Sequence, residues 1–125
     1  MEEIYIKPTE VSPEIVLSPS KKIYSIRGMS RPESPYQFYS FLLKWLDEYG
    51  AKYLNGMSIV FDLEYFNTPS ARTIRTIFAK LESLYVSGIK VNLVWVLNDE
   101  ASKDEFEYEF AHDLTIPIHF KKPTH

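Results

Sequence analysis

The chain has 125 residues, of which 45% are hydrophobic and 25% charged, and its formal net charge is −3. A chain of this length fits one domain that buries most of its apolar surface without metals or cross-links. The negative net charge argues against a nucleic-acid-binding protein, which needs a basic face to meet phosphates. The absence of cysteine excludes disulfides, thiolate metal sites and cysteine nucleophiles.

The first residues contain no basic segment followed by an apolar one, so no secretory signal is evident. No apolar run approaches the ~20 residues that a membrane-spanning helix needs. We therefore expect one domain over residues 1–125, located in the cytoplasm and not inserted in a membrane. The sequence leaves its oligomeric state open, and a monomer is the working expectation.

The first part of the chain predicts three short strands, over residues 4–6, 14–17 and 23–27. Residues 18–21 (Ser-Pro-Ser-Lys) have the composition of a turn, and Gly28 is expected to end the third strand. Strands that follow one another in this way favour an antiparallel edge of a larger sheet.

A first helix is expected after Ser34, which is a candidate N-cap followed by Pro35 at the first helical position. Gln37 would complete a capping box with Ser34. Apolar residues then recur at helical spacing: Phe38, Phe41, Leu42, Trp45, Leu46 and Tyr49. Gly50 is expected to end this helix.

The apolar run 57–63 predicts a central strand that is covered on both faces. The remaining elements alternate between helix and strand, and are expected over 69–86, 91–97, 102–113 and 116–120. Pro117 favours an edge position for the last strand. The order is β-β-β-α-β-α-β-α-β, which predicts an α/β sandwich with one mixed sheet and right-handed parallel crossovers.

The junction between a strand and a helix at residues 63–70 contains the most informative residue, Thr68. It is expected at the N-cap of the second helix, with its hydroxyl near unpaired backbone N–H groups. A phosphate on Thr68 would meet those donors and the positive end of the helix dipole. By position alone, a plain capping threonine is the commoner explanation.

A long run over residues 63–68 (Leu-Glu-Tyr-Phe-Asn-Thr) is accompanied by shorter matches along the chain. These are residues 12–15 and 28–33, Phe38, Tyr39, Trp45, Tyr49, Val94, Trp95, Ile116 and Pro117. With them the chain resembles the SiaC family of bacterial regulatory phosphoproteins over nearly its whole length. One departure is Pro69, which follows Thr68 where the family usually has serine.

The resemblance implies a fold similar to the STAS domains of anti-sigma factor antagonists. It implies that a protein kinase phosphorylates a threonine matching Thr68, and that a PP2C-type phosphatase removes the phosphate. The dephosphorylated form would bind and activate a diguanylate cyclase, raising cyclic di-GMP and promoting aggregation or biofilm growth. The chain would then be a non-enzymatic signalling adaptor without a cofactor.

Two other functions remain open at this point. The first is an anti-sigma factor antagonist that works by partner switching. The second is a small metal- or ligand-binding enzyme that uses Asp62 and Glu64. These acids alternate along a strand and should point to the same side, where they could hold Mg²⁺, although solvated or salt-bridged acids are favoured.

The residues around Thr68 are the candidate partner-binding set: Glu33, Glu64, Tyr65, Phe66, Asn67, Pro69 and Arg72. Arg72 lies one helical turn after Thr68, so it could fold back onto a phosphate or remain a solvated surface residue. Ser70 is the second candidate phosphoacceptor, and Asn67 is expected to share the capping role. Tyr65 and Phe66 are expected in a loop, either as partner anchors or as plugs of the core.

No metal site is expected, because His112, His119 and His125 lack metal-ligand spacing. The acidic residues of the third helical segment are Asp99, Glu100, Asp104, Glu105, Glu107 and Glu109. They are expected to form its solvated face, with contact to a basic partner surface as the alternative.

Overall fold

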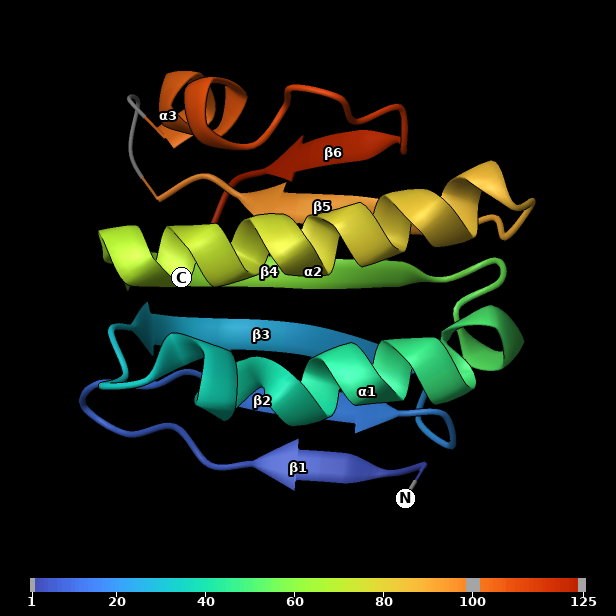
Figure 1. Cartoon of the computed structure of the whole chain (residues 1–125), viewed down its shortest axis with the longest axis horizontal. Helices are drawn as coiled ribbons and strands as arrows, with labels where there is room; N and C mark the ends of the chain where they lie inside the picture. The colour runs from blue at the N-terminus through green and yellow to red at the C-terminus, as the bar shows by residue number, and fades with distance from the viewer. Residues whose placement is uncertain (1, 99–101, 124–125) are drawn as a thin grey trace.

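The computed structural model describes residues 2–98 and 102–123. It contains one six-stranded sheet with three helices packed on one of its faces (Figure 1). The elements are β1 (Ile4–Ile6), β2 (Glu14–Ser18), β3 (Ile23–Ser30), α1 (Pro35–Tyr53), β4 (Ser58–Phe66), α2 (Thr68–Val86), β5 (Asn92–Val96), α3 (Ser102–Glu109) and β6 (Ile118–Lys121). This is the order of elements that the sequence predicts.

The six strands lie in the sheet in the same order as in the chain. β1, β2 and β3 pair antiparallel, whereas β3, β4, β5 and β6 pair parallel. The antiparallel edge and the mixed sheet are therefore confirmed, and β6 is an edge strand as Pro117 suggested. Because each parallel crossover moves one strand in the same direction and has the same hand, all three helices come to lie on one face.

The core lies between this face and the helices. Ile26, Phe61 and Trp95 are neighbours in the sheet register and are almost fully buried. Phe61 meets Phe78 of α2 edge-on, with ring centroids 4.9 Å apart, and Trp95 lies 4.9 Å from Phe106 of α3. Interlocking aromatic rings thus fix α2 and α3 against β4 and β5.

The opposite face of the sheet carries no helix within the described residues. One register row crosses all six strands there: Tyr5, Val16, Ser25, Val60, Val94 and His119. Val60 and Val94 are half-buried, while Tyr5 and His119 are exposed. The expectation that β4 is covered on both faces is therefore wrong, because its apolar run is packed by helices on one face only.

Two glycines have roles other than those expected. Gly28 lies inside β3 rather than at its end, with φ 119° at a break in the register with β4. Gly50 lies inside α1, which continues to Tyr53. A Cβ atom on Gly50 would come within 2.8 Å of Leu84 Cδ1, so this glycine permits close packing of α1 against α2.

Helix termini also differ in detail from the prediction. Ser34 is the N-cap of α1 and Pro35 follows at the first turn, but the Ser34 side chain forms no capping hydrogen bond. α3 ends at Glu109 rather than Asp113. Within the described residues, the helices are too short or too polar to cross a bilayer.

Candidate functional site

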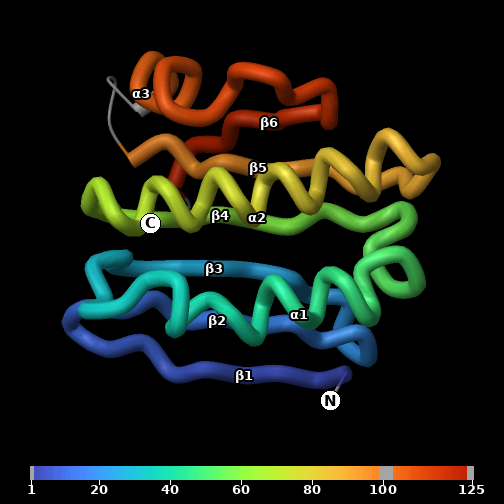
Figure 2. Tube along the Cα trace, in the orientation of Figure 1, coloured from blue at the N-terminus to red at the C-terminus, as the bar shows by residue number. Residues whose placement is uncertain are grey.

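β3 and β4 end on the same side of the molecule on which α1 and α2 begin (Figure 2). β3 ends at Ser30, β4 at Phe66, and α2 starts at Thr68. The carboxyl ends of parallel strands are the usual place for binding sites in open α/β sheets. We call this region, from Asn67 to Arg72 with the end of β4, the Thr68 corner.

Asn67, rather than Thr68, is the N-cap of α2. Its Oδ1 atom accepts a hydrogen bond from the Ser70 backbone N–H at 3.0 Å, and its carbonyl accepts one from Ala71 N–H at 2.9 Å. The backbone N–H of Asn67 donates to the Ser30 carbonyl at 3.1 Å. The predicted capping role of Thr68 is therefore wrong by one residue, because β4 ends at Phe66 and Asn67 is the first residue after it.

Thr68 is the first residue of α2 and is exposed to solvent. Its hydroxyl makes no hydrogen bond with another described residue. Pro69 has no N–H group, and Ser70 donates its own to Asn67. A phosphate on Thr68 would thus find fewer free backbone donors than the sequence suggested, although the positive end of the helix dipole remains.

Ser70 is fully buried, and its hydroxyl has no hydrogen-bond partner within the described residues. A kinase needs an accessible hydroxyl, so this placement argues against Ser70 as the phosphoacceptor and favours Thr68.

Arg72 is exposed and lies one turn along α2 from Thr68. Within the described residues, its guanidinium forms no ion pair. Arg75, one turn further, instead binds Glu109 with 3.0 Å between Nη1 and Oε2. Arg72 is therefore the available cation on α2 for a phosphate on Thr68.

Tyr65 and Phe66 belong to the last part of β4 rather than to a loop. Because neighbouring strand residues face opposite ways, their side chains separate. Phe66 packs against Trp95 and Phe110, with centroids 6.0 and 5.5 Å away, whereas Tyr65 is 49% exposed. Phe66 is thus a core plug, and Tyr65 is the aromatic residue open to a partner, with Glu64 exposed beside it.

A buried pair of hydroxyl groups, which the sequence did not reveal, lies next to the Thr68 corner. The hydroxyls of Ser30 and Tyr39 lie 2.6 Å apart, and both residues are almost fully buried. Burial raises the pKa of Tyr39 to about 12 against the opposing effect of its Ser30 hydrogen bond, so the phenol stays neutral. Since the Ser30 carbonyl also binds Asn67, this pair links α1 to the start of α2.

Asp62 and Glu64 do point to the same side of the sheet, as expected. They line a hollow of about 260 Å³ on the helix-free face together with Glu14 and Arg27. Arg27 Nη1 lies 3.6 Å from Asp62 Oδ2, which agrees with the salt-bridged alternative. Among the described residues, no cluster of metal-binding side chains includes them.

Glu33 is exposed in the loop that joins β3 to α1, three residues after Ser30.

His119 is exposed on β6 and His112 is exposed after α3, while His125 lies outside the described residues. Asp104, Glu105 and Glu107 form the solvated face of α3 as expected. Asp99 and Glu100 also fall outside the described residues.

Removal of the Asn67 cap is expected to destabilise the Thr68 corner. Asn67→Ala should lower the free energy of unfolding by about 1 kcal/mol, because Ser70 N–H loses its acceptor. Asn67→Asp retains the acceptor and should stay close to the parent. Urea denaturation measures both variants, and equal stability of the alanine and aspartate variants would show that the cap contributes nothing.

The comparisons with known proteins agree with this architecture. A family model for SiaC family regulatory phosphoproteins matches residues 6–123. The chain belongs to the SiaC family. This confirms the resemblance noted in the sequence and assigns the chain to a class of regulatory proteins rather than enzymes.

Solved SiaC structures share the fold over nearly the whole chain. The crystal structure of apo-SiaC from Pseudomonas aeruginosa has a TM-score of 0.84 and 26% identity, covering 97% of this chain and 99% of that one. SiaC from the same organism also appears in a crystal structure described as the diguanylate cyclase SiaD in complex with its activator SiaC. That match has a TM-score of 0.84 and 24% identity, and covers 96% and 99% of the two chains.

An uncharacterized protein from Pseudomonas aeruginosa strain UCBPP-PA14 is 25% identical over 119 residues, which is 94% of each chain.

Proposed function

We propose that this chain is a signalling adaptor that binds and activates a diguanylate cyclase when Thr68 is unphosphorylated, and releases it when Thr68 is phosphorylated. The observation that carries the proposal is the exposure of the Thr68 side chain at the start of α2. The Pseudomonas relative supports the choice of partner, since it forms a complex with the cyclase that it activates.

Phosphorylation would act on the surface rather than on the fold. A phosphate adds roughly −1.5 to −2 charge and three acceptor oxygens. At the first position of α2 it meets a favourable helix dipole, with Arg72 one turn away. The folded domain can therefore accept the phosphate, while a partner seated over Thr68 and Tyr65 meets new charge and bulk.

A protein kinase would add the phosphate and a PP2C-type phosphatase would remove it, so that cyclic di-GMP synthesis follows the balance of the two enzymes. Pro69 keeps the first turn of α2 in its favoured conformation and leaves the Thr68 hydroxyl exposed. The site therefore remains open to a kinase although proline replaces the serine usual in the family.

The test compares Thr68→Ala and Thr68→Asp in binding to the diguanylate cyclase from the same genome. Thr68→Ala should bind like the parent, and Thr68→Asp should bind about 5- to 150-fold more weakly, the usual range for such switches. The matched control is Thr76→Asp, which places the same charge at another exposed position of α2.

Isothermal titration calorimetry measures the affinities. The proposal fails if Thr68→Asp binds the cyclase as tightly as Thr68→Ala does. Equal weakening by Thr76→Asp would also contradict it, because the effect would then come from added negative charge anywhere on α2.

A further inference from the structure

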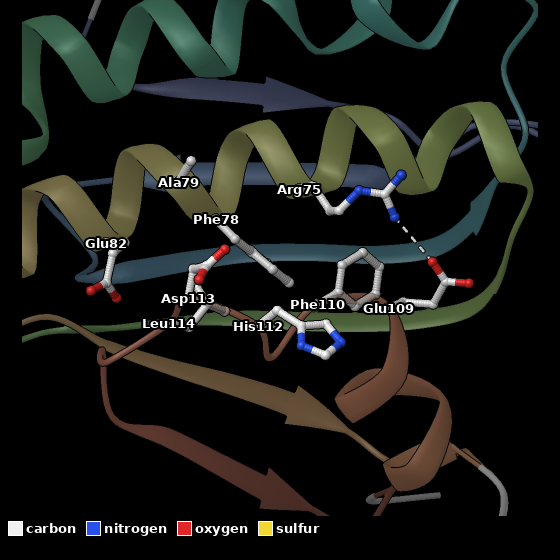
Figure 3. Close-up of a pocket in the computed structure, with 9 residues that line it drawn as sticks. All are labelled: Arg75, Phe78, Ala79, Glu82, Glu109, Phe110, His112, Asp113 and Leu114. Carbon is white, nitrogen blue, oxygen red and sulfur yellow. Dashed lines mark hydrogen bonds and ion pairs between the residues drawn. The ribbon is translucent and has the colours of Figure 1, made fainter.

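A cleft of about 320 Å³ lies between α2 and the segment that follows α3 (Figure 3). Its apolar part is formed by Phe78, Ala79, Phe110 and Leu114. The rings of Phe78 and Phe110 are almost fully buried, with centroids 5.1 Å apart, so they form a firm floor. The volume is at the lower end of the range for ligand sites, and suits one large side chain.

At each end of the cleft, a side chain of α2 bonds to a residue on the opposite wall. At one end Arg75 binds Glu109, and Figure 3 shows this pair beside the ring of Phe110. At the other end Glu82 accepts hydrogen bonds from the backbone N–H groups of Thr115 and Ile116, at 2.7 and 2.8 Å, and from the Thr115 hydroxyl. The walls are therefore held in place before any ligand binds, which lowers the ordering cost of binding.

The charged side chains that line the cleft favour a positively charged occupant. They comprise three carboxylates, of Glu82, Glu109 and Asp113, and one guanidinium, of Arg75. Arg75 is already paired with Glu109. Asp113 is exposed and forms no ion pair within the described residues, so its carboxylate is available at the rim.

The cleft is continuous with the Thr68 corner along α2. Thr68, Arg72, Arg75 and Ala79 follow one another at spacings of four, three and four residues, which places them on one side of the helix. All four are exposed. A partner seated on the Thr68 corner and lying along this side of α2 would reach the cleft.

We propose that this cleft anchors an arginine side chain of the protein partner that docks at the Thr68 corner; the identity of that partner rests on the proposed function. Arginine combines an apolar stem, which fits against Ala79 and Leu114, with a planar cation. The cation can pair with the Asp113 carboxylate at the rim. The cleft offers the matching surfaces for each part of that side chain.

The first test uses this chain alone and needs no partner. N-acetyl-arginine methylamide is titrated to millimolar concentration into the ¹⁵N-labelled protein, and the citrulline analogue, which has nearly the same shape without charge, is the control. Amide shifts confined to the cleft residues, and seen with arginine only, support the proposal. Equal shifts with both compounds, or none at the cleft, overturn it.

The second test measures binding of the cyclase by two cleft variants. Ala79→Trp fills the cleft, and Asp113→Asn removes the rim charge while keeping a residue that tolerates the left-handed backbone there, φ 68°. Each should weaken binding by about tenfold or more, the scale of a lost interface anchor. The controls, Thr76→Trp and Asp104→Asn, change exposed residues outside the cleft and should leave the affinity within twofold.

The two tests separate the inference from the proposed function. If the parent binds the cyclase and both cleft variants bind it equally well, the cleft is not part of that interface and the inference is overturned. If the parent does not bind the cyclase, the proposed function fails, and the arginine titration alone decides whether the cleft is an anchor site.

Discussion

Replacement of Phe61 by alanine is expected to lower the free energy of unfolding by about 3–5 kcal/mol. Phe61 is fully buried in the middle of β4, where its ring meets Phe78 edge-on and lies 6.4 Å from Trp95. Its removal leaves a cavity between the sheet and α2 that these rigid rings cannot close. Because small domains are stable by only about 5–15 kcal/mol, this one change should bring the protein close to unfolding.

Urea denaturation followed by tryptophan fluorescence measures this loss. Phe61→Leu, which keeps much of the volume, should cost less than half as much. Tyr108→Ala is the surface control, because Tyr108 is 78% exposed and its loss should change stability by no more than about 0.5 kcal/mol. A cost below 1 kcal/mol for Phe61→Ala would show that β4 and α2 do not pack as described.

Replacement of Glu82 by alanine is expected to cost about 1–3 kcal/mol. This carboxylate is the acceptor for two backbone N–H groups and one hydroxyl of residues Thr115 and Ile116. Ile116 is almost fully buried, so its N–H group cannot easily find water as a substitute. The segment between α3 and β6 would lose its connection to α2, and one end of the cleft would loosen.

The contribution of Glu82 should depend on pH. Burial raises the pKa of Glu82, but the hydrogen bonds from Thr115 and Ile116 outweigh it, and the net pKa lies below the usual carboxyl range. A carboxyl group whose pKa is lowered by folding stabilises the protein above its unfolded pKa, and this stabilisation is lost as the pH falls through the folded value.

Glu82→Gln provides the matched variant, since it keeps one acceptor oxygen and does not titrate. The stability difference between parent and Glu82→Gln should be largest at neutral pH and should shrink in acid. Glu48→Gln is the surface control, because it removes an exposed carboxylate from the middle of α1, away from both helix ends, and its stability should stay close to that of the parent in the same measurements. A difference for Glu82→Gln that grows in acid would contradict the hydrogen-bonding scheme.

The order of the elements could be predicted because their periodicities are strong and local. Buried residues of α1 such as Leu42, Trp45 and Leu46 recur at helical spacing, and the apolar runs of β4 and β5 are bounded by turn residues. The junction between a strand and a helix around Thr68 was predicted from the same kind of signal. Each of these predictions uses neighbours within a few residues in the chain.

The choice of helix cap could not be predicted in the same way. Asn67 and Thr68 can both cap a helix, so the decision lies in where β4 ends. The pairing of Tyr65 with Met29 and of Phe66 with Ser30 extends β4 to the residue before Asn67. That pairing joins residues 36 positions apart, with a break in register after Gly28, and leaves no local mark in the sequence.

Gly50 and the cleft illustrate the same limit. Glycine often follows the last residue of a helix, so the sequence predicts that the first helix ends at Gly50. In the structure Gly50 lies inside α1, next to Leu84 of α2. The cleft joins α2 to residues of the segment after α3, so its charge and floor appear only when both are placed together. The covered and bare faces of the sheet likewise depend on the direction of every crossover.

We propose that a phosphate on Thr68 controls binding of the partner. The most direct measurement isolates the protein from its own host, identifies the modified residue by mass spectrometry, and compares cyclase binding by the phosphorylated form before and after phosphatase treatment. We expect to find phosphate on Thr68 and a gain in affinity of about 5- to 150-fold when it is removed. Phosphate-free protein under all growth conditions, or equal affinity of the two forms, would contradict it.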